Sequence, residues 1–332
     1  MDLKFTEEHE LIRRTARDFA REELAPGAAN RDQNAIYPTE QLKKLAELGF
    51  CGMFVPEKYG GAGLDSISYC LAIEEISKVD ASMGVIISVT NSLAGYPILT
   101  FGNEDQKQKY LVPLAKGETL GAFCLTEPGA GSDAAAQTTV AVRDGDYYVV
   151  SGAKHFVTSG THADTFIVTV MTDRSKGVKG TSSLIIEKGF LNAEGKPGVK
   201  VQPPEHKLGI RSSDTHAIVF DNCRVPVANR LGNEGDGLKV ALSALDSGRM
   251  GIAAQALGIA QASLEASLLY AHQRKQFGKF LKDFQATQFK FADMETRIQA
   301  ARLLLYQSAL KKDSGQRYTK EAAMAKLFCS ET

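Results

Sequence analysis

The spacing of apolar residues changes twice along this chain of 332 residues, and that change limits the folds open to it. In residues 1–120 apolar side chains recur at helical spacing. Short runs rich in Val, Ile, Thr and Tyr follow, and after Pro226 the helical spacing returns in longer segments. We therefore predict an α+β protein with an N-terminal α-helical domain at residues 1–120, a middle antiparallel β-sandwich or barrel domain at 121–230, and a C-terminal α-helical bundle at 231–332.

Local signals place the individual elements. Thr6 and Thr39 are suited to begin helices, which are predicted to end before Pro26 and at Gly49. Further helices are predicted at residues 66–78, 82–100, 103–114, 237–271, 284–312 and from 319 onward. Strands are predicted at residues 138–142, 146–151, 165–171, 182–187, 198–202 and 216–220. The last helix meets no Gly or Pro stop signal before Thr332, so we expect an incomplete bundle.

The charge balance argues against several classes of partner. Lys and Arg number 39 and so do Asp and Glu, which gives a formal net charge of 0. The long-range field that nucleic-acid binding needs is therefore absent, and we expect no such partner. The polar start is unlike a signal peptide, and the longest apolar run, residues 84–89, is too short to span a membrane, so we expect no membrane insertion.

The cysteines and histidines show no metal-ligand spacing. The five Cys are scattered without a Cys-x-x-Cys pair, which indicates reduced thiols, and the six His include no i, i+4 pair. We expect no metal site and a cytoplasmic protein, although a mature mitochondrial matrix protein would have a similar sequence.

One glycine motif resembles a nucleotide-binding fingerprint. Residues 129–134 (GAGSDA) satisfy G-x-G-x-x-A, but β-type sequence follows in place of the helix that a Rossmann unit requires. We therefore disfavour a Rossmann domain. A glycine-rich loop can still approach a cofactor closely, because glycine has no Cβ.

Several segments, in the same order and spacing, resemble the acyl-CoA dehydrogenases, which are flavoenzymes that desaturate acyl-CoA thioesters. Residues 124–133 (CLTEPGAGSD) resemble the first signature of the family, and 152–160 (GAKHFVTSG) its second flavin segment. Residues 55–61 and 207–213 resemble two of its structural loops, and 90–97 (TNSLAGYP) the helix that floors the acyl pocket. Residues 274–279 with 284–286 resemble the segment that reaches the FAD of a neighbouring subunit. The whole chain is similar to the short-chain, butyryl-CoA-like branch.

The resemblance implies an FAD-dependent enzyme that dehydrogenates an acyl-CoA substrate, passes electrons to an electron-transfer flavoprotein and assembles as a homotetramer. The FAD-binding residues that it implies are Phe123, Leu125, Thr126, Gly131, Ser132, Phe156, Thr158, Arg274, Phe277 and Gln285. The residues that it implies for substrate are Ser132, Asp246 and Arg249.

Structural roles compete with these functional ones. Phe156 could pack in a core, Thr158 and Ser132 could form turns, and Asp246 with Arg249 could be a helix ion pair. A solvated basic run is the alternative for Arg274.

No catalytic residue is assigned, because the chain offers no matched base. The reaction needs a carboxylate that removes the α-proton. By resemblance this is a Glu in a C-terminal segment beyond Thr332, or in a minority of relatives a Glu at the position of Gly248. The chain is then either a fragment of a dehydrogenase or a shortened, non-catalytic FAD- or CoA-binding relative. An acyl-CoA oxidase that uses O₂ is a further alternative.

Overall fold

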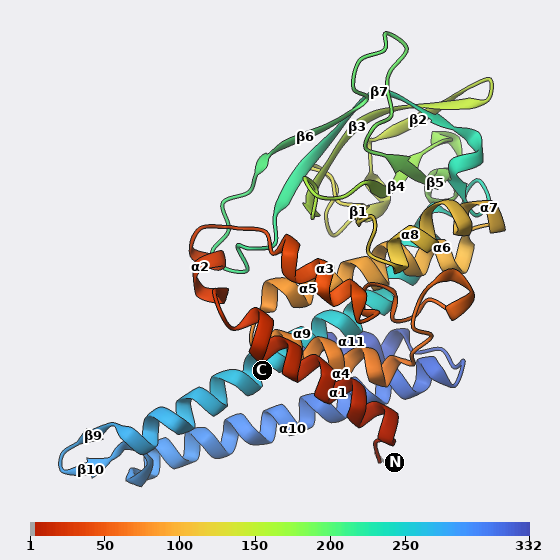
Figure 1. Ribbon diagram of the computed structural model, residues 1–332. Helices are drawn as coiled ribbons and strands as arrows, with labels where there is room; N and C mark the ends of the chain where they lie inside the picture. Colours follow the sequence, from red (N-terminus) through yellow and green to blue (C-terminus); the bar gives the residue numbers. More distant parts are fainter. Residues whose placement is uncertain (1–3) are drawn as a thin grey trace. The chain divides into compact units, whose positions relative to one another are not determined.

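Figure 1 shows the computed structural model of the protein, which describes residues 4–332. The chain forms two compact units. Unit 1 comprises Met1–Ala28, Asp65–Val85 and Arg249–Thr332, and unit 2 comprises Ala29–Leu64 and Ile86–Gly248. The α+β class is confirmed: helices precede and follow a sheet in the chain. The three domain boundaries placed from sequence remain a prediction.

The sheet lies in unit 2. Its order is β6-β7-β3-β2-β4-β5-β8, and β1 pairs with β4. The strands are β1 (Gly121–Cys124), β2 (Val140–Asp144), β3 (Tyr147–Thr158), β4 (Thr165–Met171), β5 (Thr181–Glu187), β6 (Val199–Pro204), β7 (Thr215–Pro226) and β8 (Arg230–Leu231). A single residue pair, Val140 with Met171, joins β2 to β4, so two antiparallel sections meet at one point.

Strand β1 was not predicted from the sequence. It runs parallel to β4, with Gly121 opposite Thr165. Its four residues contain no β-branched side chain, so they lack the usual strand signal. The middle region is therefore antiparallel with two parallel pairings.

The strand β4 lies at the centre of the core of unit 2. Other strands, such as β2 and β3, have both buried and more exposed positions, whereas β4 does not. β4 is buried at every position from Thr165 to Met171. Tyr148, Phe166 and Phe220 are among the largest fully buried side chains around it. A strand covered on both faces has a nearly continuous apolar sequence, and β4 (TFIVTVM) is interrupted after Thr165 only by Thr169.

The helical part of unit 2 is fixed by a buried asparagine. The Asn91 side chain accepts from the Met53 N–H at 2.7 Å and donates to the carbonyls of Phe50 at 2.8 Å and Ile87 at 2.9 Å. Asn91 lies in the π-helix Thr90–Gly95, which is followed by α6 (Tyr96–Phe101). These bonds hold the segment around Met53 against the π-helix.

Three further short α-helices lie in unit 2. They are α3 (Thr39–Glu47), α7 (Glu104–Gln106) and α8 (Val112–Ala115). Of these, α8 contributes buried Leu114 and Ala115 to the core of unit 2. The helix α2 (Ala28–Gln33) begins in unit 1 and continues in unit 2, and it was not predicted from the sequence.

Unit 1 is helical. It contains α1 (Glu7–Phe19), α4 (Ser66–Ser77), α10 (Gln285–Asp313), α11 (Thr319–Glu331) and parts of α5 (Ala81–Val89) and α9 (Gly237–Gln273). Buried Glu74 binds two groups of α10: Arg302 Nη2 at 2.8 Å and Tyr306 Oη at 3.2 Å. In Figure 1, α9 and α10 run side by side to the small hairpin β9 (Lys275–Gln276) and β10 (Lys279–Phe280).

Two helical stretches are long and apolar enough to cross a membrane by length and composition: Ala81–Phe101 with 21 residues and Gly237–Gln273 with 37. The sequence argument considered only the short run at residues 84–89 and missed both. These criteria are weak, because buried core helices also meet them, and 67% of the first window is buried.

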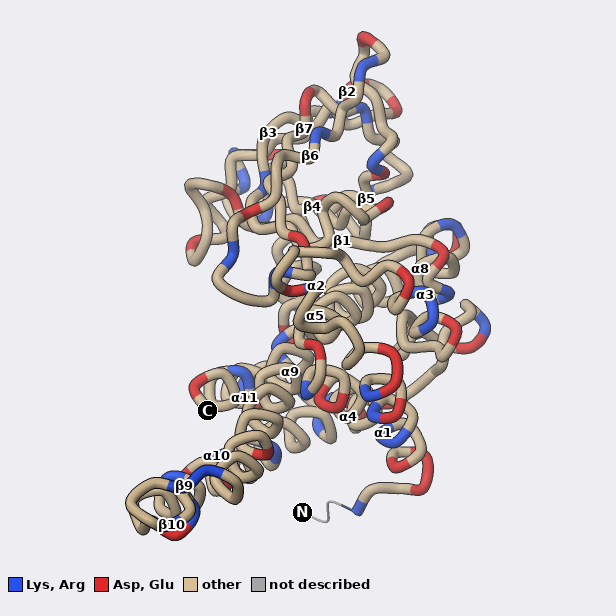
Figure 2. Tube along the Cα trace, turned by 60° about the vertical axis from the view of Figure 1, so that its left-hand side comes forward, with Lys and Arg blue, Asp and Glu red and all other residues tan. Residues whose placement is uncertain are grey.

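Basic and acidic positions are interspersed in both units (Figure 2).

Candidate functional site

A small cavity in unit 2 gathers residues from both flavin motifs. Its volume is about 130 Å³. Its lining consists of Val89, Leu93, Phe123, Leu125, Thr126, His155, Phe156, Thr158 and Leu245. Five residues predicted to bind FAD are in this list: Phe123, Leu125, Thr126, Phe156 and Thr158. The tertiary structure thus brings the two motifs together on one cavity.

A bulge in β3 turns Phe156 toward the cavity. The pairing of β3 with β7 shifts register between Lys154 and Val157, and Phe156 has a φ of 58°. Neighbouring strand residues normally point to opposite faces. The bulge breaks this alternation, so His155 and Phe156 both line the cavity.

The environment of Phe156 argues against the core-packing alternative. The residue is 64% exposed, although it is a large aromatic. Its left-handed backbone costs on the order of 1 kcal/mol for a residue other than glycine. An exposed ring held at that cost is typical of a functional position.

The glycine loop between β1 and β2 leaves open space beside it. Glu127 and Ala130 exchange backbone hydrogen bonds of 3.0 and 3.1 Å, which closes a tight turn. A Cβ added to Gly129 or Gly131 would meet no protein atom within 4 Å. The loop is followed by one 3₁₀ turn, Ala134–Ala136, and not by the helix that a Rossmann unit requires. The sequence disfavoured a Rossmann domain for the same reason. The open backbone fits the close approach of a cofactor.

A buried ion pair lies behind the loop. Lys154 Nζ is 2.8 Å from Glu127 Oε1, and it also donates to the Leu125 carbonyl at 3.1 Å and to Gln137 Oε1 at 3.0 Å. Burial raises the pKa of Glu127, but hydrogen bonds from Lys154 and from the Thr138 backbone outweigh it and hold that pKa at about 2. Burial lowers the pKa of Lys154, and Glu127 partly offsets the change.

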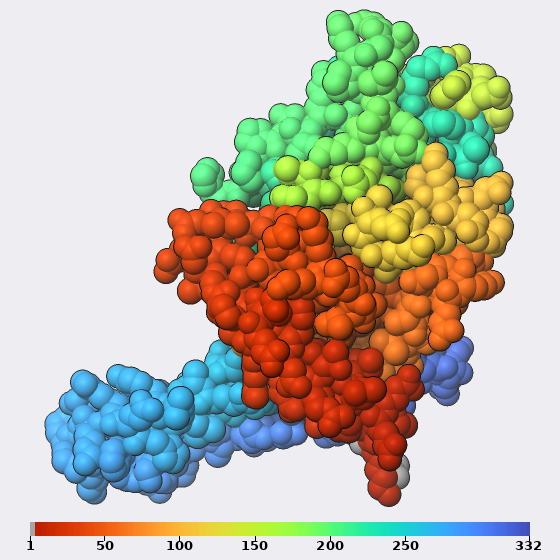
Figure 3. Space-filling view, in the orientation of Figure 1, coloured from red at the N-terminus to blue at the C-terminus, as the bar shows by residue number. Residues whose placement is uncertain are grey.

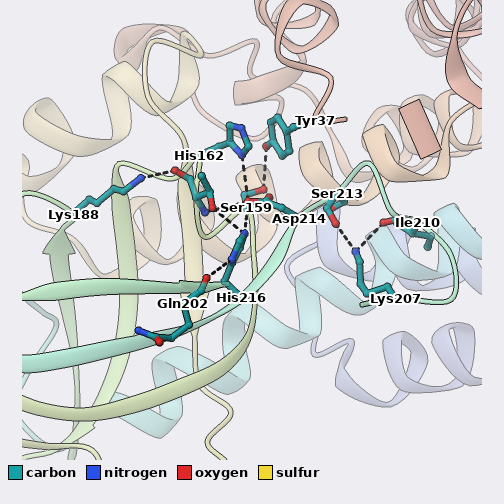
Figure 4. Close-up of polar contacts among 11 residues, drawn as sticks. Tyr37, Ser159, His162, Lys188, Gln202, Lys207, Ile210, Ser213, Asp214 and His216 are labelled. Carbon is teal, nitrogen blue, oxygen red and sulfur yellow. Dashed lines mark hydrogen bonds and ion pairs between the residues drawn. The ribbon is translucent and has the colours of Figure 1, made fainter. Parts of the chain in front are cut away.

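A second polar cluster surrounds Asp214, as Figure 4 shows. Asp214 Oδ2 lies 2.9 Å from His216 Nε2, 3.2 Å from His162 Nδ1 and 3.1 Å from the Thr161 nitrogen. The other ring nitrogen of His216 lies 2.8 Å from the Gln202 carbonyl. Asp214, His216, His162 and Thr161 border a cavity of about 670 Å³ in unit 2.

The Asp214 cluster holds the segment that follows Thr158. Ser159 has a φ of 62°, and its N–H donates to the Asp214 carbonyl at 3.0 Å. Ser159 Oγ is 3.1 Å from Tyr37 Oη, and the Tyr37 ring stacks on His162 with centroids 3.7 Å apart. The strand segment that carries Phe156 and Thr158 is thus anchored by polar groups at both ends.

The seven remaining predicted residues all lie outside the cavity lining, and three of them belong to unit 2. Gly131 and Ser132 are exposed or open on the glycine loop, and Asp246 follows the lining residue Leu245 on α9. Gly248 is packed closely: an added Cβ would lie 2.9 Å from Leu93 Cδ2. A Glu side chain at that position would not fit without a shift, and no Asp or Glu of residues 4–332 lines this cavity.

Unit 1 holds the other predicted residues. Arg249 is on α9, and Arg274, Phe277 and Gln285 lie on or beside the hairpin that connects α9 to α10. Phe277 is 92% exposed with a φ of 52°, and its ring meets Phe284 edge-on at 6.5 Å. Figure 3 shows this connection as an exposed knob.

Four lining residues were not among the predicted site residues. Leu93 lies within the segment 90–97, and Leu245 lies beside Asp246, so both were close to predicted positions. Val89 precedes that segment directly. His155 lies within the segment 152–160, but the resemblance assigned it no role; β3 continues past the predicted strand to Thr158, and its bulge brings His155 and Phe156 to one side.

Family comparisons agree with this geometry. The N-terminal, middle and C-terminal domain models of the acyl-CoA dehydrogenases match residues 6–118, 122–223 and 235–332. The chain belongs to the acyl-CoA dehydrogenase family. The family consists of FAD-dependent oxidoreductases, so the predicted family, enzyme class and cofactor are confirmed.

The relatives include proteins of the short-chain branch. A short-chain specific acyl-CoA dehydrogenase of Clostridium acetobutylicum is 49% identical over 99% of this chain and 86% of its own. A 3-(aryl)acrylate reductase of Clostridium sporogenes is 46% identical over 99% of this chain and 85% of its own. The family therefore contains more than one named reaction at this level of identity.

Solved structures give the same assignment. The butyryl-CoA dehydrogenase of Megasphaera elsdenii has a TM-score of 0.96 at 46% identity, with 100% of this chain and 86% of that chain covered. A chain solved in work on the electron transferring flavoprotein of Acidaminococcus fermentans also has a TM-score of 0.96, at 49% identity over the same shares.

Proposed function

We propose that this protein catalyses the FAD-dependent α,β-dehydrogenation of a short-chain acyl-CoA thioester. The observation that carries the proposal is the meeting of both flavin motifs on one cavity beside an open glycine loop. FAD, when bound, would take up the β-hydrogen as hydride, while a carboxylate removes the α-proton.

The residues of unit 2 would hold and shield the cofactor. Thr126 and Thr158 would donate hydroxyl hydrogen bonds to the ring system without adding charge. Phe156 would cover the ring and exclude water, since its side chain lines the cavity. Gly131 and Ser132 would face the phosphate-containing parts of the ligands, with Ser132 shared between cofactor and CoA.

The residues of unit 1 would serve a neighbouring subunit. Arg274 would bind the FAD diphosphate of that subunit, because a planar guanidinium matches phosphate oxygens, and Phe277 and Gln285 would flank it. Such sharing requires an oligomer, and we propose a homotetramer. Asp246 and Arg249 would line the channel for CoA. The protein would reside in the cytoplasm and pass its electrons to an electron-transfer flavoprotein.

An anaerobic titration tests the proposal. Butyryl-CoA added to the FAD-loaded protein should bleach the flavin absorbance, and a flavin spectrum that stays unchanged would contradict dehydrogenation by this chain. Because no carboxylate of residues 4–332 lines the cavity, this assay also separates an enzyme from a protein that only binds FAD. Peroxide released in air would identify the oxidase alternative.

The relative that is an aryl-acrylate reductase suggests a second substrate for the same assay. An arylpropionyl-CoA should be titrated in parallel with butyryl-CoA. Bleaching by the arylpropionyl-CoA alone would replace the short-chain substrate assignment with an aryl one.

The variant Thr158→Val tests the flavin contact. It retains the shape of the side chain and removes its hydroxyl, so flavin binding should weaken.

A further inference from the structure

The Lys154–Glu127 ion pair is buried completely, and Lys154 is bonded to a residue that lines the cavity. The two side chains are 0% and 1% exposed. Lys154 Nζ donates to the carbonyl of Leu125, and Leu125 is one of the residues that line the cavity. Glu127 accepts instead from groups at the start of β2: the Thr138 nitrogen at 2.6 Å, the Thr138 hydroxyl at 2.7 Å and the Thr139 nitrogen at 3.0 Å.

The pair is therefore oriented. Its positive end is bonded to the peptide that joins Leu125 to Thr126, both of which line the cavity, and its negative end is bonded to Thr138 and Thr139, which do not. A charge-assisted bond to the carbonyl of that peptide polarises it and makes the Thr126 N–H a stronger donor. Thr126 lines the cavity.

The pair also ties the glycine loop to β3. Lys154 belongs to β3 and Glu127 to the loop, and the His155 N–H donates to the Thr126 carbonyl at 2.8 Å directly beside them. Two neighbouring contacts thus join the strand that carries Phe156 to the loop that carries Thr126.

Stability alone does not explain a buried pair at this place. Removing two charges from water costs several kcal/mol for each ion, and well-packed apolar residues often stabilise a fold as well or better. The orientation and the position beside the cavity suggest another use.

We propose that the Lys154–Glu127 pair is a positioning element of the flavin site, which fixes the Thr126 loop against β3 and turns positive potential toward the bound flavin. This inference rests on the proposed function, because it assumes that flavin occupies this cavity. A flavin gains negative charge on reduction, and a nearby positive pole stabilises the reduced form. The pair should therefore raise the midpoint potential of the bound cofactor.

Two single variants make opposite predictions. Lys154→Met removes the positive end and leaves Glu127 charged, so the flavin midpoint potential should fall. Glu127→Gln retains the cation and removes the negative end, so the potential should rise. A pair that only supported the fold would loosen the loop in both variants and shift the potential in the same direction, or not at all, and either result would overturn the proposal.

Flavin affinity provides a second readout. Loss of the charge-assisted bond to the Leu125 carbonyl should weaken flavin binding by about tenfold in Lys154→Met, as judged by the dissociation constant from flavin fluorescence. The double variant, Lys154→Met with Glu127→Gln, leaves no unpaired charge and covers the case in which Lys154→Met does not fold. Its potential should lie below that of the wild type, and an unchanged potential would contradict the inference.

A surface pair supplies the matched control. Lys109 Nζ lies 2.7 Å from Glu187 Oε1 in the same unit, with side chains 61% and 33% exposed, and neither residue lines the cavity. Lys109→Met and Glu187→Gln should leave the potential and the affinity for flavin unchanged.

Hydrogen exchange on the flavin-free protein distinguishes failure of this inference from failure of the proposed function. In Lys154→Met the His155 amide, which is bonded to Thr126, should exchange at least about tenfold faster than in Lys109→Met. Equal rates would refute the positioning role even if flavin binds. If the wild type binds no flavin, the proposed function and the electrostatic role are both refuted. Faster exchange of the His155 amide in Lys154→Met would then still establish that the pair attaches the loop to β3.

Discussion

The Asp214 carboxylate lies 2.9 Å from His216 Nε2, and the same oxygen also meets His162 at 3.2 Å. One partly buried acceptor thus joins β7 to the segment that follows Thr158.

Asp214→Asn should destabilise the protein by about 2 kcal/mol, because hydrogen bonds to a charged group are replaced by weaker neutral ones. Urea unfolding measures the change. Asp221→Asn is the control, on the strand that Asp214 directly precedes: Asp221 pairs with Lys200 at 2.6 Å, but both side chains are substantially exposed, so its loss should cost less than about 1 kcal/mol. If both variants lower the free energy of unfolding equally, the Asp214 cluster does not stabilise the protein more than an exposed ion pair does.

Phe156 should show a conflict between stability and function. Phe156→Gly relieves the left-handed backbone, so it should unfold less readily than Phe156→Ala by about 1 kcal/mol in the flavin-free protein. Both variants lose the ring and should bind flavin more weakly than the wild type. Thermal unfolding and flavin fluorescence measure the two effects, and a less stable glycine variant would mean that the backbone at Phe156 is not strained.

Glu127 should contribute to acid sensitivity. Its pKa in the folded protein is about 2, against an ordinary value of 4.5. Its contribution to stability is therefore fully present above pH 4.5 and is lost as the pH falls toward 2, by at most about 3 kcal/mol. Denaturant unfolding at a series of pH values should show a shallower loss over this range for Glu127→Gln than for the wild type. Parallel curves would contradict the low pKa.

Two glycines of α9 should respond differently to alanine. A Cβ on Gly258 would lie 2.4 Å from the Glu74 carbonyl oxygen, which is backbone and cannot move freely. Gly258→Ala should therefore destabilise by about 1–3 kcal/mol despite the better helix propensity of alanine. A Cβ on Gly248 would meet side-chain atoms alone, closely only at Leu93 Cδ2, which is the end of a flexible side chain, so Gly248→Ala should change stability by less than about 1 kcal/mol. Calorimetry on both variants checks the order.

Part of the candidate site could be read from the sequence. The motifs around Thr126 and Thr158 were recognised as flavin segments, and the structure places both residues on one cavity. His155 could not be predicted there, because the register shift between Lys154 and Val157 depends on how β3 pairs with β7. The Asp214 cluster also went unpredicted, since its members come from three separate segments of the chain.

The sequence by itself determined the order of helical and strand regions, because burial periodicity follows from local backbone geometry. It also determined the family, because the motifs are contiguous runs of residues. Only the tertiary structure decided that Lys154 pairs with Glu127 and that its charge is directed at the Leu125 peptide. Such contacts depend on strand register and loop path, which arise from packing across the whole unit, and no local pattern encodes them.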